Sequence, residues 1–316
     1  MKTRASLVAL AIALAVMAVI LYRLDWPAVI ATWARVIWPW VVATAIVHVA
    51  DSWIQGLRWR TVLGASDVEV KPSTAFWAML VGTVSNVVLP FKLGEAARAW
   101  AVARLANAPI STVASTVVLD RLVDLGTLVI LLIVIPPIVG PVVGVRLPSP
   151  RILLVAVGLA FVVLALAAAW WRRLRLSRKR SGAGGFGPRV ESFVRGLNAL
   201  RQHHILAQAI AWAICSWCVR AVVVWAMLQA FGLDWPLVRA AMILIIINIS
   251  IGVVATPGNI GTFELAAAGA LRLLGATPEV AMSFAIILHL AEVLPTALLG
   301  ALAIWKFGLK LQRPDQ

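Results

Sequence analysis

The chain has 316 residues, of which 62% are hydrophobic and 13% charged, and its formal net charge is +15. In a soluble protein such a basic balance would suggest a nucleic-acid partner. The apolar content and several apolar runs of about 20 residues argue against nucleic acid and predict an all-α polytopic membrane protein. Cys215 and Cys218 lie inside one apolar run, so we interpret them as helix-face residues and expect no disulfide, metal or cofactor.

Apolar runs predict about six full spans. In chain order they cover residues 6–24, 36–54, 110–139, 152–171, 205–231 and 278–305. Tryptophans crowd the start of the second span, as is typical of the membrane interface. Arg58, Trp59 and Arg60 follow this span, and we expect them to begin a polar loop at the membrane surface that continues to Lys71.

Two further apolar segments, 73–104 and 238–276, are each interrupted by proline and glycine. The first break runs over residues 90–95 and the second over residues 257–264. Proline and glycine continue a helix only at a cost, and the freed backbone groups must face protein or a watery cavity. We therefore predict two re-entrant hairpins, each containing a broken helix.

The distribution of Lys and Arg predicts the orientation. About 20 of the 28 basic residues lie in the cytoplasm if both termini, the loops near residues 58 and 98, and a basic loop at 172–203 are placed there. We expect a bacterial inner-membrane protein whose loop 172–203 contacts anionic lipid headgroups. In this orientation the first broken segment enters from the cytoplasm and the second from the opposite side.

The two halves of the chain, 1–149 and 150–316, align weakly at a shift of about 168 residues. The Pro-x3-Gly pattern of the first break falls on that of the second. Arg121 falls on His289, and Asp124 falls on Glu292. Opposite orientations of two similar halves with broken helices in matching positions are typical of transporters, whose central site lies between the halves. We predict a single transmembrane domain of two inverted repeats.

Three motifs of this sequence resemble the flippase-like transmembrane domain of lysylphosphatidylglycerol synthases. They are Ser85-Asn86-x3-Pro90-x3-Gly94-Glu95-Ala96-x-Arg98, Leu119-Asp120-Arg121 and Pro257-Gly258-x2-Gly261-x2-Glu264. The resemblance covers nearly the whole chain and implies lipid translocation, of aminoacylated phosphatidylglycerol in the best-known case. The resemblance also implies that some relatives are associated with hopanoid or polyprenyl-glycan pathways. Because no soluble aminoacyl-transferase domain follows Trp305, the resemblance implies a stand-alone member that does not synthesise the modified lipid.

The candidate site residues are polar, charged or helix-breaking positions inside apolar segments. They are Asn86, Pro90, Gly94, Glu95, Arg98, Asp120, Arg121, Asp124, Arg220, Asn248, Pro257, Gly258, Asn259, Gly261, Glu264, His289 and Glu292. Helices that start at mid-membrane point free N–H groups into a cavity, which suits a lipid phosphate, and Arg121 or Arg220 could add a full cation. Asp51, also inside an apolar run, needs a partner or water.

A structural role competes with each functional one. Asp120, Arg121 and Asp124 either contact a substrate or neutralise one another, and Glu95 and Glu264 could serve only the helix dipole. His48 and His289 could carry protons, although a neutral hydrogen-bonded histidine is the more favoured interpretation. Proton coupling through Asp124, Glu292 or His289 is a hypothesis.

We expect the chain to move a lipid or lipid-linked anionic or amphipathic molecule between leaflets by alternating access, and not to be an enzyme. No G-x4-G-K-[ST] run is present, so ATP hydrolysis is not expected. A membrane-integral lipid-modifying enzyme, or a scaffold for a lipid or glycan biosynthetic enzyme, remains the alternative.

Overall fold

The structure is a computed structural model that describes residues 25–89, 93–139, 193, 202–253 and 256–307. The described residues form helices joined by short connections, with no strand among them, which confirms the all-α prediction for this part of the chain. The expected spans 6–24 and 152–171, Pro90 and almost all of the basic loop 172–203 lie outside the described residues.

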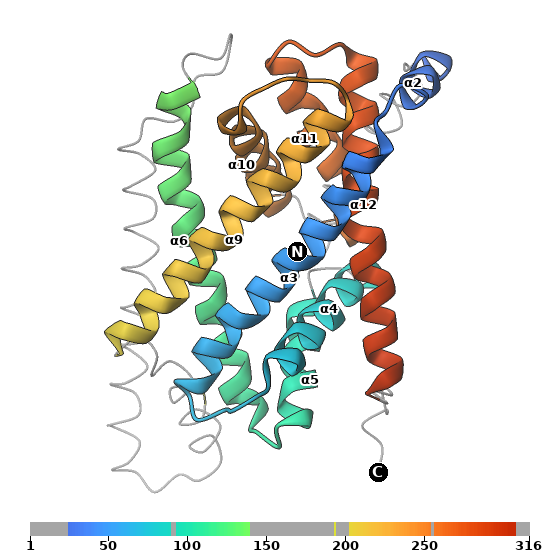
Figure 1. The fold of residues 1–316 in the computed structure, drawn as a ribbon. Helices are drawn as coiled ribbons and strands as arrows, with labels where there is room; N and C mark the ends of the chain where they lie inside the picture. The colour runs from blue at the N-terminus through green and yellow to red at the C-terminus, as the bar shows by residue number, and fades with distance from the viewer. Residues whose placement is uncertain (1–24, 90–92, 140–192, 194–201, 254–255, 308–316) are drawn as a thin grey trace, which may run out of the picture.

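Ten helical elements make up the described bundle (Figure 1). They are α2 (Trp26–Trp33), α3 (Trp38–Gly64), α4 (Pro72–Val88), α5 (Gly94–Leu105), α6 (Ile110–Val139), α9 (His203–Ala230), α10 (Leu237–Val253), the 3₁₀ turn η2 (Pro257–Asn259), α11 (Thr262–Leu273) and α12 (Pro278–Lys306). Proline occupies the first or second position of α2, α3, α4 and α12, where its missing N–H costs no hydrogen bond.

Three described helices are long and apolar enough to cross a membrane: α6, α9 and α12. A fourth span results if α2 and α3, which meet at an angle of 84°, are counted together. The outer face of α12 carries a stripe of exposed leucines, Leu290, Leu294, Leu298 and Leu302. Spacing of four residues places these side chains on one helix face, where a bilayer and not water is the compatible solvent.

The helix α3 extends ten residues beyond the predicted end of its span. Arg58 and Trp59 therefore lie inside α3 and are fully buried, and the prediction that they begin a surface loop is wrong. The hydropathy pattern failed here because Arg58 is neutralised by carboxylates of another helix, so a charged residue does not mark the membrane surface. Arg60, two positions on, is exposed as expected.

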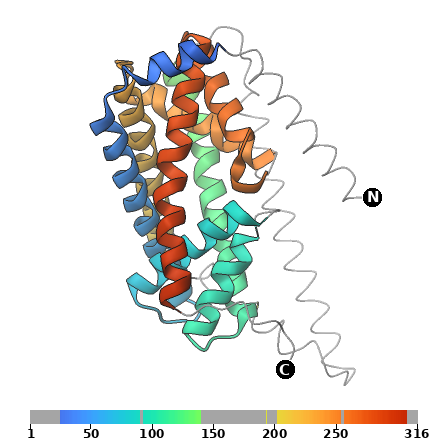
Figure 2. The same ribbon diagram turned by 90° about the vertical axis from the view of Figure 1, so that its right-hand side faces the viewer.

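The long helices α3 and α9 lie side by side and run in opposite directions (Figure 1). The α4–α5 hairpin lies at one end of the bundle, and α11 lies at the other (Figure 2). The end of α4 packs against η2, since a Cβ on Gly258 would lie 3.7 Å from Val87 Cα. The end of α4 and the second break therefore lie in contact.

Each break follows from its glycines. In the second break Gly258 and Gly261 have φ of 61° and 87°, a region that glycine enters without steric cost. In the first, α5 begins at Gly94, where a Cβ would lie 2.0 Å from the Gly82 carbonyl oxygen of α4. Only a residue without a side chain allows α4 and α5 to approach this closely.

Candidate functional site

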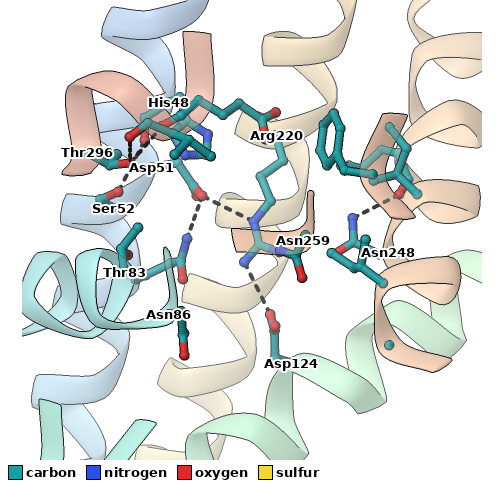
Figure 3. Close-up of a pocket in the computed structure, with 18 of the residues that line it drawn as sticks. His48, Asp51, Ser52, Thr83, Asn86, Asp124, Arg220, Asn248, Asn259 and Thr296 are labelled. Atoms are coloured by element: carbon teal, nitrogen blue, oxygen red, sulfur yellow. Dashed lines mark hydrogen bonds and ion pairs between the residues drawn. The ribbon is translucent and has the colours of Figure 1, made fainter. Parts of the chain in front are cut away.

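A cavity of about 640 Å³ lies between the two halves of the bundle, with walls from α3, α4, α5, α6, α9, α10, η2, α11 and α12. Part of its wall is apolar, and the rest is polar or charged (Figure 3). The polar and charged wall residues are His48, Asp51, Ser52, Gln55, Thr83, Asn86, Glu95, Arg121, Asp124, Arg220, Asn248, Thr256, Asn259, His289, Glu292 and Thr296.

Arg220 on α9 crosses the cavity wall and joins two carboxylates from different helices (Figure 3). Its Nε lies 3.1 Å from Asp51 Oδ2 on α3, and its Nη2 lies 3.4 Å from Asp124 Oδ1 on α6. The guanidinium also lies over the Trp217 ring, 4.8 Å from the centroid. Asp51 is held further by Ser216 Oγ at 2.6 Å and Gln55 Nε2 at 2.7 Å. Arg220 is therefore fixed in position at the cavity wall.

Behind this wall, Arg58 and Arg98 neutralise the acids of α6. Arg58 Nε donates to Asp120 Oδ1 at 2.7 Å, and its Nη1 donates to Asp124 Oδ1 at 2.8 Å. Arg98 Nη2 lies 3.1 Å from Asp120 Oδ2 and 2.8 Å from Glu95 Oε2. Asp120 is thus neutralised from α3 and α5, not by its neighbours along α6.

Arg121 is the most exposed of the four arginines in this network, with 43% of its side chain accessible. It pairs with Glu95 at the start of α5, and its Nη1 lies 3.7 Å from Asp124 Oδ2. The network contains four arginines (58, 98, 121 and 220) and four carboxylates (Asp51, Glu95, Asp120 and Asp124). Its formal charge is therefore zero, and no cation in it lacks a counter-ion.

The second break has its own polar contact, centred on His289 of α12. His289 Nδ1 lies 2.6 Å from Glu264 Oε1, and Nε2 lies 3.0 Å from the Gly258 carbonyl oxygen. The Phe263 ring stacks on the imidazole at 4.4 Å. The other carboxylate oxygen of Glu264 accepts a hydrogen bond from the Gly261 N–H at 2.7 Å. His289 thus joins α12 to both sides of the break.

Glu292 lies one turn after His289 and also lines the cavity. Unlike Asp51, Glu95 and Asp124, its side chain makes no ion pair or hydrogen bond with the described residues. His48 of α3 lines the same cavity, and its Nδ1 is a buried nitrogen without a hydrogen-bond partner among the described atoms. The cavity therefore has a firmly paired side and a less constrained side.

The structure brings most of the predicted site residues to one cavity. Those that line it are Asn86, Glu95, Arg121, Asp124, Arg220, Asn248, Asn259, His289 and Glu292. The remaining described ones lie behind the wall: Gly94, Arg98, Asp120, Pro257, Gly258, Gly261 and Glu264. The expected free N–H groups at the helix starts have internal acceptors, since Gly94 N–H donates to Asn86 Oδ1 at 2.8 Å and Gly261 N–H to Glu264.

Three ionisable residues of this region were absent from the predicted set: His48, Asp51 and Arg58. Uncharged wall residues were absent from it as well, namely Ser52, Gln55, Thr83, Thr256 and Thr296. A signal for two of the ionisable residues exists in the sequence. Asp51 and Arg58 are seven residues apart, a separation that places side chains on the same face of a helix. Because Arg58 was assigned to a loop, this periodicity could not be used.

The fold and the cavity define a multi-pass helical membrane protein with a neutralised ionic network at its centre. The chain belongs to the lysylphosphatidylglycerol synthase TM region family, whose model matches residues 6–300. No curated protein matches the chain.

Proposed function

We propose that this protein moves a lipid with a polar headgroup between the two leaflets, with the headgroup passing through the central cavity. The observation that supports this most directly is the position of the cavity: polar and charged groups of both halves face it, while the outer surface of α12 is apolar. These two surfaces match the two parts of a lipid, because the headgroup needs the polar contacts of the cavity and the tails need only the apolar outer surface.

The pattern of elements supports two inverted repeats. The helices α3 and α4 recur as α9 and α10 at a shift of about 165 residues, and α5 and α6 recur as α11 and α12 at a shift of about 168. Arg121 and His289 each occupy the twelfth position of their helix and bind Glu95 and Glu264, which open the helix before. The pair Glu95–Arg121 thus has its counterpart in Glu264–His289.

The contact between α3 and α9 supports the same arrangement. Asp51 and Ser216 are each the fourteenth residue of their helix, and they bind one another at 2.6 Å. Equivalent positions meet only where a two-fold pseudo-symmetry axis passes between them. With antiparallel α3 and α9, this axis lies across the bundle, as inverted repeats require. We propose six full spans and two broken hairpins in a bacterial inner membrane, with both termini cytoplasmic.

Arg121 and Arg220 are the cavity residues we assign to a headgroup phosphate or other anion. Both already bind carboxylates, so an arriving anion exchanges with Glu95, Asp51 or Asp124 and does not meet a free cation. Such exchange makes binding weak and reversible, which suits a transporter, because a tightly bound substrate would not leave. Polar amides at Asn86, Asn248 and Asn259 offer uncharged hydrogen bonds.

The proposal is tested by reconstitution of the purified protein in vesicles that contain a headgroup-labelled phosphatidylglycerol, with a labelled phosphatidylethanolamine in parallel. A membrane-impermeant quencher should reach only the outer leaflet of empty vesicles and both leaflets when the protein is present. Vesicles whose inner leaflet stays protected for every lipid tested would contradict the proposal and favour a scaffold. A lipid species missing from a deletion strain would favour a membrane-integral enzyme.

Variants locate the site. Arg220→Ala should reduce the translocation rate by at least about tenfold, because a charge-assisted contact contributes roughly 1.5–3 kcal/mol. Arg220→Lys keeps Asp51 paired and tests whether the two-pronged guanidinium is needed.

Gly261→Leu should also reduce the rate, because a side chain with φ near 87° strains the second break. Arg60→Ala on exposed α3 surface is the matched control, and equal rates for it and Arg220→Ala would place the site elsewhere.

A further inference from the structure

The contacts of His289 with Glu264 and Gly258 fix the number of protons that His289 and Glu264 hold between them. The Gly258 carbonyl oxygen can only accept, so the Nε2 atom of His289, 3.0 Å away, carries a hydrogen and donates it. On the other side, Nδ1 lies 2.6 Å from Glu264 Oε1. Two lone pairs do not approach to this distance, so one proton lies between these two atoms.

This shared proton leaves the pair without net charge wherever it sits. If it belongs to Nδ1, the pair is an imidazolium and a carboxylate, and if it belongs to Oε1, the pair is a neutral imidazole and a carboxylic acid. Removing it leaves a neutral imidazole with one hydrogen and a carboxylate. The single hydrogen of the ring is then donated either to Glu264 or to the Gly258 carbonyl oxygen. The hydrogen bond to the other acceptor is lost.

We propose that the Nδ1–Oε1 bond of His289 and Glu264 is a binding site for a proton that locks the second broken helix. With the proton bound, α12 holds the break through Gly258 and the start of α11 through Glu264. Without it, one of these connections opens. The inference rests on the proposed function, which it deepens by naming a coupling ion and the element that the ion controls.

The equivalent contact in the first half cannot respond in this way. Arg121 takes the place of His289 and binds Glu95 at the start of α5. A guanidinium stays protonated at all relevant pH values, so this pair keeps its bond. The ion pair at the first broken helix therefore does not respond to pH, whereas the second broken helix is locked only while a proton is present.

Other charged groups near the site can exchange the proton or act on it. Glu292 lies on the same helix one turn away and lines the cavity together with His289. His48 and Asp51 face it from α3, and Arg220 faces it from α9. The packed helices α2 and α4 contain no charged residue, and Arg239 of α10 and Arg272 of α11 lie at the ends remote from the break. Glu292 has no ion-pair partner among the described residues, and both it and His289 line the cavity, from which the proton can arrive.

Glu264→Gln provides a sharp test, because the amide keeps every contact without the shared proton. Its oxygen can accept from Gly261 N–H, and its NH₂ can donate to Nδ1, while Nε2–H still donates to Gly258. Amide hydrogen exchange of residues 258–264 should be measured in lipid nanodiscs at pH values from about 5 to about 8. Rates are corrected for the intrinsic effect of pH.

In the wild-type protein the corrected exchange rate of residues 258–264 should rise about tenfold with pH, the effect of losing one hydrogen bond. In Glu264→Gln the rate should not depend on pH. His289→Arg, which copies the arginine of the first half, should also show no pH dependence and serves if Glu264→Gln does not fold. A pH-independent wild type, or a Glu264→Gln variant with the same pH dependence as the wild type, would overturn the inference.

The exchange measurement needs no transport and so separates the two proposals. A pH-dependent lock in a protein that moves no lipid would leave the proton site standing and remove the proposed function. If lipid moves at equal rates in wild-type and Glu264→Gln vesicles over the same pH range, and amide exchange is independent of pH, the proposed function stands and the proton site is removed.

Discussion

At the scale of single residues, the ionic network explains how eight charged side chains are tolerated in an apolar bundle. A charge inside a membrane costs at least a few kcal/mol unless it is paired or wetted, and each arginine of the network touches one or more carboxylates. Buried pairs of this kind contribute little net stability, but removal of one partner leaves an uncompensated charge. Each arginine pairs with two acids, and Arg58 has the largest consequence because it is the most buried of the four, with 1% of its side chain exposed.

Arg58→Ala should therefore lower the free energy of unfolding by about 3–5 kcal/mol, because Asp120 and Asp124 would lose a shared counter-ion in a buried position. Arg60→Ala, on the exposed side of the same helix, removes only an exposed hydrogen bond to the Val70 carbonyl oxygen and should change it by about 1 kcal/mol at most. Thermal unfolding of both purified variants in one detergent measures the difference. Similar melting temperatures for the two would show that Arg58 is not a structural counter-ion.

At the scale of elements, close helix packing positions the cavity wall. The helix α12 crosses α4 at Gly300, where a Cβ would lie 2.4 Å from the Leu80 carbonyl oxygen and 2.9 Å from Val84 Cβ. Small residues permit such backbone approach between membrane helices, which associate through packing and not through the hydrophobic effect. The contact keeps α12, with His289 and Glu292, next to α4, with Thr83 and Asn86.

Gly300→Ala should destabilise the protein by roughly 1–3 kcal/mol, since the added methyl group forces α4 and α12 apart. Gly126→Ala is the matched control, because Gly126 also lies inside a spanning helix but a Cβ there meets nothing within 4 Å. The control should be neutral or slightly stabilising through helix propensity. Denaturant unfolding of the pair measures both effects, and a control that loses as much stability as Gly300→Ala would refute the packing argument.

At the scale of the whole molecule, the two hairpins belong to opposite ends of the bundle (Figure 2). Their connections to the following helix are short loops at exposed positions, Pro109 before α6 and Thr277 before α12. These two positions also align between the halves at the shift of about 168 residues. If the halves are inverted repeats in a bilayer, the two loops lie on opposite sides of the membrane.

A cysteine at position 109 should react with an impermeant thiol reagent from the cytoplasmic side only, and a cysteine at position 277 from the opposite side only. Pro109→Cys and Thr277→Cys are made after Cys215 and Cys218, both exposed on α9, are replaced by serine. The serine-only protein gives the background. Labelling of both positions from the same side would contradict the inverted arrangement.

The sequence was a good guide to elements and a partial guide to the site. The predicted spans 110–139 and 278–305 nearly coincide with α6 and α12, because long apolar runs bounded by proline or glycine leave little choice of structure. The breaks at 90–95 and 257–264 were located by the same residues that create them. The end of α3 was missed because charge was used as a marker of the surface, and that marker fails for a neutralised arginine such as Arg58.

The sequence by itself determined that this chain is helical, lies in a membrane and is interrupted twice, because hydropathy and backbone restrictions act locally along the chain. It also marked Arg121, Asp124, Arg220 and Glu292 as charges in need of partners. Only the tertiary structure decided the partners, since ion pairs such as Arg220–Asp51 and Arg58–Asp120 join residues far apart in sequence. It likewise decided that both His289 nitrogens are engaged, because that depends on where α12 lies against the second break.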